Sequence, residues 1–517
     1  DNADTDDDND GVADGSDAFP FDATETLDTD SDGIGNSADT DDDNDGVPDA
    51  WATAQLGSDI DGDAGDIAGR LALSGDGTVL AVGSWGWDSY TGFVRIFKWN
   101  ASSRDWIQQG STIYGNNQYD FSGYSISLSN NGSVVAIDSS GGTPTNEAGY
   151  VQVFAWDGQD WAQRGNNIAG ESAGDACCYL SLAGDGATIA VGAQRSAGSS
   201  NLVDSGQTRV FTWNGVDWIQ KGSRIDGEAA NDRSGRWATR ISSDGLSVAI
   251  GARMNDGNGS ESGHVRIYKW VNSDWVQRGR DIDGELAGDL SGNSVSLSSN
   301  GNIVAIGAPG NDWVGDGAGH VRVFGWNNTT LSWIQRGQDI DGQRSTCVDG
   351  ASYTDPDGDG ITDTCGEESG WASYLSSDGS TLAIGAWKND DNGTDSGQTR
   401  VYGWDEPSQL WVRKGAYIDG KAAGDHSGYQ TSVSSDGSVF ATGAWGNKGT
   451  DVGGYVRVFS LTSPNDAFPL DATESVDTDS DGIGNNADTD DDGDGVDDSS
   501  DAFPLISLGG LTDTDAD

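Results

Sequence analysis

Acidic residues at a fixed spacing are the side chains of this sequence with the clearest chemistry. From Asp6 onward, carboxylates stand at the first, third, fifth, ninth and twelfth positions of one segment, and Gly11 stands at the sixth. A loop that wraps a calcium ion needs oxygen ligands at these positions, a backbone carbonyl at the seventh and a glycine for the turn at the sixth. The segment therefore predicts a calcium-binding loop.

The same spacing returns at both ends of the chain, with loops that start at residues 28, 41, 477 and 490. The loop at 41 lacks only its last ligand, because its twelfth position is Ala52. The predicted ligands of the N-terminal loops are Asp6, Asp8, Asp10, Val12, Asp14, Asp17, Asp28, Asp30, Asp32, Ile34, Asn36, Asp39, Asp41, Asp43, Asp45, Val47 and Asp49. Those of the C-terminal loops are Asp477, Asp479, Asp481, Ile483, Asn485, Asp488, Asp490, Asp492, Asp494, Val496, Asp498 and Asp501. Incomplete loops are expected from Asp1 and Asp4 at one end and from Asp513, Asp515 and Asp517 at the other.

A run of aspartates is also typical of a solvated tail whose charges repel one another. The regular loop starts favour metal binding over this alternative, because successive starts within each end are 13, 22 or 23 residues apart. The formal net charge of -58 makes cations the expected partners and excludes nucleic acid and anionic membranes. Ca²⁺ is favoured over Mg²⁺, which loses its water reluctantly and demands a strict octahedron.

One more loop lies in the middle of the chain, within residues 343–369. Its predicted ligands are Asp355, Asp357, Asp359, Ile361 and Asp363. Its twelfth position is Gly366, so Glu367 or Glu368 is expected to close the site. Cys347 and Cys365 bracket the loop and are predicted to form a disulfide, which implies an oxidising compartment. For the adjacent Cys177 and Cys178 the sequence leaves open a disulfide between neighbours or two buried thiols.

Catalytic residues are not evident in the sequence. Of three histidines, His264 and His320 share one repeat position, which is typical of a structural role, and His426 stands alone. No motif combines a nucleophile with a base and a group that orients the base. We therefore expect that the chain is not an enzyme.

The 20 tryptophans fall into two groups. Most recur at two fixed positions of a repeat, which is typical of packing between repeated units. The irregular ones lie in long loops that share one face, and they are the candidates for a ligand-binding face: Trp85, Trp87, Trp313, Trp387 and Trp445.

The elements that must position these residues have two compositions. Residues 1–50 and 464–517 contain no Lys or Arg, and the middle holds all 27 basic residues. The middle carries seven copies of a segment such as "GHVRIYKW", which begin at Gly92, Gly149, Gly206, Gly263, Gly319, Gly397 and Gly454, in steps of 57, 57, 57, 56, 78 and 57 residues. A period of this length, rich in short strands and glycine turns, is typical of β-propeller blades.

Each copy is expected to supply four strands, the fourth being a segment such as "WIQRGQDI". The seventh copy stops after its third strand, and residues 53–62 match the missing fourth. An N-terminal strand is therefore predicted to complete the last blade, which closes the ring and leaves no sheet edge exposed. The expected fold is all-β: a seven-bladed β-propeller of residues 52–463, closed by an N-terminal strand and flanked by irregular calcium-wrapped arms of residues 1–51 and 464–517.

Both parts resemble known families. The arms resemble bacterial thrombospondin type 3 repeats, through the aspartate loops and the connecting "DAFPFDATETLDTD" and "DAFPLDATESVDTD". This resemblance implies arms with almost no apolar core, wrapped around a row of calcium ions. The middle resembles secreted propellers of the FG-GAP and integrin type, through "SGNSVSLSSNGNIVAIGAPGND". It departs from that family because its first hairpin has only a two-residue turn, where integrin-type blades carry a calcium loop.

Together these features predict an extracellular, calcium-stabilised structural or adhesive protein at a bacterial cell surface. Because the terminal loops are incomplete, we expect copies to join end to end in a stalk or fibre. The alternative is a lectin-like propeller that binds polysaccharide through the tryptophan face, and a secreted enzyme is the third hypothesis. No membrane insertion is expected, because no apolar run approaches the length of a membrane span.

Overall fold

The structure is a computed structural model, which describes residues 18–19, 52–62, 66–140, 148–175, 177–198, 202–315, 317–343, 366–446, 453–462, 478–479, 483–493, 496–498 and 505. The chain separates into two compact units, Asp1–Ala54 with Leu461–Asp517, and Gln55–Ser460. The predicted loops of residues 6–49 and 355–363, the terminal aspartates, and Cys347 with Cys365 lie outside the described residues.

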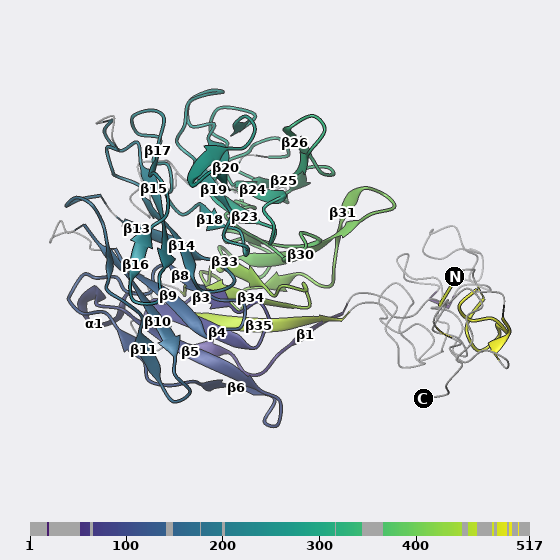
Figure 1. Ribbon diagram of the computed structural model, residues 1–517. Coiled ribbons are helices and arrows are strands. Elements are labelled where there is room, and N and C mark those ends of the chain that lie inside the picture. The colour runs from purple at the N-terminus through teal and green to yellow at the C-terminus, as the bar shows by residue number, and fades with distance from the viewer. Residues whose placement is uncertain are drawn as a thin grey trace. The chain divides into compact units, whose positions relative to one another are not determined.

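The described part of the second unit is a ring of seven antiparallel sheets of five strands each, which confirms the predicted seven-bladed β-propeller (Figure 1). Blade 1 consists of β3 (Arg70–Leu73), β4 (Val79–Ser84), β5 (Phe93–Asn100), β6 (Asp105–Gln108) and β7 (Ile113–Tyr114). Blade 2 consists of β8 (Ile126–Leu128), β9 (Val134–Ser139), β10 (Tyr150–Trp156), β11 (Trp161–Gln163) and β12 (Ile168–Ala169). Blade 3 consists of β13 (Cys177–Leu182), β14 (Thr188–Ala193), β15 (Gln207–Trp213), β16 (Trp218–Gln220) and β17 (Ile225–Asp226).

The remaining blades repeat this order along the chain. Blade 4 consists of β18 (Thr239–Ile241), β19 (Ser247–Ala252), β20 (His264–Val271), β21 (Asp274–Gln277) and β22 (Ile282–Asp283). Blade 5 consists of β23 (Ser294–Leu297), β24 (Ile303–Ala308), β25 (His320–Asn327), β26 (Ser332–Gln335) and β27 (Ile340–Asp341). Blade 6 consists of β28 (Ala372–Leu375), β29 (Thr381–Ala386), β30 (Gln398–Asp405), β31 (Leu410–Arg413) and β32 (Ile418–Asp419). Blade 7 consists of β33 (Ser427–Val433), β34 (Val439–Ala444), β35 (Tyr455–Thr462), β1 (Ala52–Gln55) and β2 (Ile60–Asp61).

The ring closes through the N-terminal strand, as predicted. Figure 1 shows β1 beside β35, and both β1 and β2 pair with β35. The amide of Leu56 donates to the carbonyl of Val458 at 2.8 Å. The innermost strands touch in the order β3, β8, β13, β18, β23, β28 and β33, and β33 touches β3 again. The last blade is therefore built from both ends of the propeller segment.

The outermost strand differs from the prediction, because it is split into two short strands in each blade. In blade 5 the break falls at Gly337, whose φ of +83° is strained for other residues. A Cβ there would lie 2.9 Å from the Trp404 ring of the next blade. A glycine is needed at this point because the neighbouring blade packs directly against the backbone.

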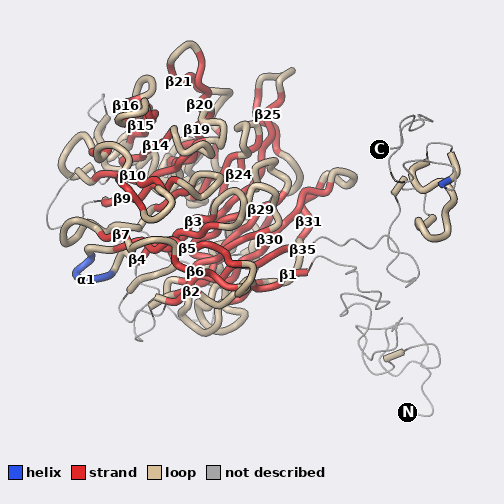
Figure 2. The backbone as a smooth tube through the Cα atoms, turned by 60° about the horizontal axis from the view of Figure 1, so that its bottom comes forward, coloured by secondary structure: helices blue, strands red, loops and turns tan. Residues whose placement is uncertain are grey.

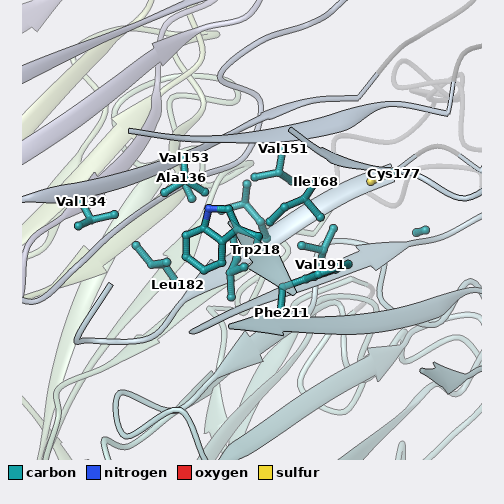
Figure 3. Packing of buried hydrophobic residues seen from close by; sticks show 13 residues of the cluster. Val134, Ala136, Val151, Val153, Ile168, Cys177, Leu182, Val191, Phe211 and Trp218 are labelled. Carbon is teal, nitrogen blue, oxygen red and sulfur yellow. The ribbon is translucent and has the colours of Figure 1, made fainter. Parts of the chain in front are cut away.

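The apolar core lies between neighbouring blades. The second strands are mostly apolar, and β4, β9, β14, β19 and β29 are buried along their whole length. Figure 3 shows the Trp218 indole among the aliphatic side chains of blades 2 and 3, which include Val134 and Leu182. Burial of such side chains supplies about 25 cal/mol for each Å² of apolar surface removed from water.

Backbones of neighbouring blades meet at one glycine in nearly every second strand. At Gly251 in β19, a Cβ would lie 2.1 Å from the carbonyl oxygen of Gly292, which precedes the innermost strand of the next blade. The recurring glycine of segments such as "VAIGA" is thus required by close approach.

The recurring tryptophans join neighbouring blades at the outer edge, which confirms their predicted packing role. In six blades an indole N–H donates to a backbone carbonyl of the preceding blade at 2.8 or 2.9 Å; these are Trp106, Trp161, Trp218, Trp275, Trp333 and Trp411. Figure 2 shows how little helix accompanies the strands of the propeller, where α1 (Trp87–Tyr90) is a single turn.

Candidate ligand-binding site

The innermost strands place an unusual set of side chains at one end of the central channel. In five blades a glycine with positive φ lies one to four residues before this strand, and in blade 7 Gly428 is the second residue of the strand. The residues that follow these glycines are Arg70, Tyr124, Arg236, Asn293, Trp371 and Tyr429. In blade 3, Tyr179 takes this place after Cys177 and Cys178. One position of the repeat thus carries large aromatic or cationic side chains instead of a repeated residue.

Aromatic rings form a closed belt around this channel mouth. Going round the belt, the distances between ring centroids are 5.5, 6.0, 6.4, 5.2, 5.7, 4.8 and 6.2 Å. The belt runs through Trp85, Tyr124, Tyr179, Trp237, Trp371, Tyr429 and Trp445 and returns to Trp85. Trp387 and His426 extend it, because Trp387 lies 5.1 Å from both Trp371 and His426. Tilted and edge-to-face contacts at these separations are favourable for aromatic rings, so the belt is a rigid wall.

Arg70 projects into the belt. Its guanidinium carbon lies 4.0 Å from the ring centroid of Tyr124 and 4.6 Å from that of Tyr429, and its Nη2 donates to the Tyr429 hydroxyl at 3.3 Å. Burial is the largest influence on the pKa of Arg70 and lowers it, but Tyr124, Tyr429, Tyr179 and Asp138 together raise it above the ordinary value. Arg70 is therefore a fixed positive charge stacked between two rings.

Further guanidinium groups lie in blade 4. Arg236 lies 3.9 Å and Arg253 4.4 Å from the ring centroid of Trp237. Nη1 of Arg253 donates to Oδ1 of Asn293 at 3.1 Å. Arg240, in β18, also lines the channel. Nitrogen atoms of Arg70 (Nε), Arg236 (Nε and Nη1) and Arg240 (Nε) are buried and have no hydrogen-bond partner among the described residues. Buried donors without partners cost free energy, so a ligand that accepts from them would be stabilised.

The belt opens on a small cavity of about 70 Å³. It is lined by side chains from blades 1 to 7, including Arg70, Tyr179, Trp371 and Tyr429, and Arg240 lines both this cavity and the next one along the channel. Among the described residues, no Asp or Glu lines either cavity. In a chain with 85 acidic and 27 basic residues, this makes the channel a local exception to the negative charge.

Asp138 lies behind the belt in β9 and is sealed from solvent, with 1% of its surface exposed. Burial raises its pKa to about 8, although the Ser125 amide and the charge of Arg70 act in the opposite direction. The Ser125 amide donates to its Oδ1 at 2.7 Å. Asp138 is therefore protonated at neutral pH and adds no negative charge to the channel mouth.

Glu367 and Glu368, expected to close a calcium loop, form buried ion pairs instead. Glu367 accepts two hydrogen bonds from Arg400, at 2.5 and 2.7 Å. Glu368 accepts from Lys388 at 2.7 Å and from the Trp387 indole at 2.8 Å. In the described residues, both buried carboxylates thus take cationic partners from blade 6. Both charges are thereby neutralised next to the aromatic belt.

The structure separates the five tryptophans predicted for a ligand face. Trp85 and Trp445 belong to the belt and Trp387 extends it. Trp87 lies in another cluster, 5.1 Å from Tyr114, and Trp313 is 78% exposed. Arg70, Arg240 and the tyrosines of the belt were not predicted from the sequence. For Arg70, Tyr124 and Tyr429 the signal was the residue after a glycine, which varies between blades while its neighbours repeat; Arg240, inside β18, had no such signal.

Part of the predicted C-terminal calcium loops is described. Oδ1 of Asn485 accepts from the Thr478 amide at 3.0 Å, and Oδ1 of Asp498 accepts from the Asp491 amide at 2.9 Å. The pKa of Asp491 is raised by loss of hydration and by nearby carboxylates, first Asp498 and then Asp488. Two predicted ligands, Asp488 and Asp498, thus lie close enough to Asp491 to raise its pKa. Elsewhere, His264 and His320 each lie with two carboxylates that could hold a metal ion.

Comparison with known proteins identifies no family: no family model matches the chain, and no curated protein matches it. Solved structures with a similar fold include a suggested 6-phosphogluconolactonase from Bacteroides uniformis, with 14% identity and a TM-score of 0.43 over 68% of this chain and 84% of that one. Hydrazine synthase from Kuenenia stuttgartiensis has 11% identity and a TM-score of 0.45 over 79% of this chain and 97% of that one. The periplasmic gluconolactonase of Pseudomonas aeruginosa has 13% identity and a TM-score of 0.41 over 69% and 85%. At these identities the likeness concerns the propeller fold, and each name describes that protein.

These comparisons correct the expectation of a structural or adhesive protein that is not an enzyme. The solved propellers similar to this chain include proteins named as lactonases, which are enzymes. The rings of the belt come from six blades and its arginines from blades 1 and 4, so no contiguous motif reveals this group of side chains. In the part of the chain that the structure describes, no helix is long and apolar enough to span a membrane.

Proposed function

We propose that the channel mouth binds a small organic carboxylate that carries a ring. The observation that carries this proposal is the lining of the cavity, which presents Arg70 and Arg240 and, among the described residues, no acidic side chain. A carboxylate would find unpartnered guanidinium N–H donors there. Arginine matches the geometry of a carboxylate and stays charged at any physiological pH.

The ring of the ligand would lie against the aromatic belt. Trp371 and Tyr429 line the cavity and present rings on which a sugar or an aromatic ring can stack. Burial raises the pKa of Tyr179 and Tyr429, so both hydroxyls stay protonated and can donate hydrogen bonds to the ligand.

The test is isothermal titration of the full chain, in the presence of Ca²⁺, with two acids and their neutral counterparts. D-glucuronate is paired with D-glucose, and benzoate is paired with benzyl alcohol, so that the two ring types are separated. We expect one acid of the two to bind at the channel mouth and its neutral counterpart to bind at least tenfold more weakly. A hydrogen bond to a charged group contributes about 1.5–3 kcal/mol, which corresponds to roughly 10- to 100-fold in affinity.

Variants locate the site. Arg240→Gln and Arg70→Gln should each weaken binding of the acid by about tenfold or more, by the same reasoning. Arg164→Gln is the matched control, because Arg164 also stacks on a tryptophan, 4.8 Å from the Trp213 ring centroid, but outside the channel lining. Binding of neither acid, or equal binding by wild type and both channel variants, would overturn the proposal. D-glucuronate is also supplied as its lactone. Release of the free acid is followed by NMR, which shows whether the site is also catalytic.

We also propose that the acidic arms bind Ca²⁺ and that the protein works outside the cell. The regular loop spacing supports this, as does the group of carboxylates around Asp491 in the described part of the C-terminal arm. Divalent cations would neutralise this repulsion and order the loops. Calcium is abundant outside cells, where loops of moderate affinity remain loaded. Small-angle scattering before and after chelation tests the calcium assignment, with expansion expected on chelation.

A further inference from the structure

One repeat position, the first residue of the third strand, differs between blades in an informative way. In blades 3 and 6 it is glutamine: Gln207 donates to Glu171 at 3.2 Å, and Gln398 donates to Asp419 at 2.7 Å. In blades 2 and 7 it is tyrosine, and in blade 1 it is phenylalanine. Both tyrosine hydroxyls donate to a carboxylate, at 2.7 and 2.9 Å. The position therefore usually holds an apolar ring or a donor with a carboxylate partner.

In blades 4 and 5 the same position is histidine, and at least one nitrogen of each imidazole has no hydrogen-bond partner among the described residues. His264 and His320 are each 1% exposed. Nε2 of His264 and both ring nitrogens of His320 are buried and have no hydrogen-bond partner in the described structure. A buried imidazole nitrogen without a partner is costly unless something absent from the protein chain binds it.

Two carboxylates accompany each histidine. Glu228 and Asp281 accompany His264, and in each group one oxygen of each carboxylate and one imidazole nitrogen lie within 4.8 Å of one another. The second group consists of Glu285, His320 and Asp339. These are the groups of three metal-ligating side chains found among the described residues. In blade 3 the position of Asp281 is Arg224, which forms an ion pair with Glu171 at 2.9 Å, so no comparable group exists there.

We propose that each of these two groups binds one divalent transition-metal ion of the Zn²⁺ type, through one imidazole nitrogen and two carboxylates. Imidazole nitrogens and carboxylate oxygens are both zinc ligands, and zinc sites with three protein ligands keep water at the fourth position. The ligands come from neighbouring blades, since Glu228 follows β17 of blade 3 while His264 and Asp281 belong to blade 4. The second group joins blades 4 and 5 in the same way. Each ion would thus tie two blades together.

Charge and access are compatible with this proposal. Arg266 lies 3.3 Å from one oxygen of Glu228, and Arg322 lies 3.4 Å from one oxygen of Glu285, which leaves the second oxygen of each for a metal. Asp281 lines an open groove between blades 4 and 5, so an ion can reach the first site from solvent. Burial, followed by the charge of Arg322, lowers the pKa of His320 to about 4, so its imidazole is neutral and can donate a lone pair.

The expected role of the two histidines changes accordingly. The sequence indicated a structural role from their shared repeat position. The structure adds the unpartnered imidazole nitrogens and the two carboxylates beside each histidine. Binding of a cation explains these groups better than a packing role does. This inference is independent of the proposed ligand at the channel mouth, because the two sites share no residue.

The test measures bound zinc in the full chain. Protein saturated with Ca²⁺, so that the acidic arms are occupied, is dialysed against micromolar Zn²⁺, and retained zinc is counted by mass spectrometry. Wild type should retain two more ions than His264→Gln/His320→Gln, and each single variant should retain one fewer than wild type. Glutamine is a suitable replacement because blades 3 and 6 carry it at this position. His426→Gln, which removes the remaining histidine, is the control and should retain both ions.

X-ray absorption at the zinc edge should show one nitrogen ligand at about 2.0 Å with oxygen ligands completing the shell. If the histidine variants do not fold, Asp281→Asn and Asp339→Asn provide a second route to the same loss. The inference is overturned if the double histidine variant retains as much zinc as wild type, or if wild type retains none above that variant.

Discussion

The buried acid Asp138 should make the propeller less stable as pH rises. It occupies a position in β9 where the other blades have glycine, and burial raises its pKa from 3.8 to about 8. The folded state keeps its proton up to about pH 8, whereas the unfolded chain releases it near the ordinary pKa of 3.8. The stabilisation that comes with this proton is fully present below the unfolded pKa and is lost as pH rises through the folded pKa.

The magnitude follows from the difference in proton binding. Between the two pKa values the folded state holds one proton more than the unfolded state, so the free energy of unfolding falls by about 1.4 kcal/mol for each pH unit. From pH 5 to pH 7 this group alone should lower stability by about 3 kcal/mol, as an upper value. Asp138→Asn removes the titration and keeps an oxygen that accepts from the Ser125 amide.

The assay is guanidinium denaturation followed by tryptophan fluorescence at pH 5, 6 and 7 with Ca²⁺ present. Wild type should lose stability over this range relative to Asp138→Asn, and the difference between the two curves should grow steadily with pH. Asp185→Asn, in an exposed turn, controls for the removal of one negative charge. If wild type and Asp138→Asn show the same dependence on pH, the burial argument is refuted.

Three further perturbations test other parts of the structure. Gly251→Ala places a Cβ 2.1 Å from a carbonyl oxygen of the next blade and should lower the free energy of unfolding by about 2 kcal/mol or more. Gly325→Ala, where a Cβ would have no atom within 4 Å, is the control and should be neutral or slightly stabilising. Equal effects of the two variants in denaturation curves would contradict the packing argument. Glu367→Gln leaves the buried Arg400 without its counter-charge and should cost about 3 kcal/mol in the same assay, and an unchanged midpoint would show that the pair contributes nothing. Removal of Ca²⁺ should expand the arms, as measured by small-angle scattering, and should leave the β-sheet signal of the propeller in circular dichroism unchanged. A scattering profile that does not respond to calcium would rule out the calcium loops.

The propeller could be predicted because its determinants are local and repeated. A segment such as "GHVRIYKW" returns with a nearly constant step, and the tryptophans at fixed positions indicated packing between blades. Closure was also visible, because residues 53–62 match a strand that the seventh copy lacks. The split of the outermost strand was not predicted, since it depends on how closely Trp404 of the next blade approaches Gly337.

The candidate site could be predicted only in part. Trp85, Trp387 and Trp445 were selected because they interrupt the repeat in long loops of one face, and the structure brings them together. Arg70 and Arg240 escaped notice because each is a single charged residue within a strand. These arginines meet the aromatic rings only because the innermost strands of all blades converge on one channel. A local sequence pattern does not indicate which residues meet there.

The most direct test of the channel site is anomalous diffraction from crystals soaked with p-iodobenzoate, an aromatic carboxylate with a heavy atom. We predict an iodine peak inside the aromatic belt, with the carboxylate in contact with Arg70 or Arg240, and loss of that peak in crystals of Arg240→Gln. A channel mouth that stays without an iodine peak in wild-type crystals, or a peak that persists unchanged in the variant, would contradict the account.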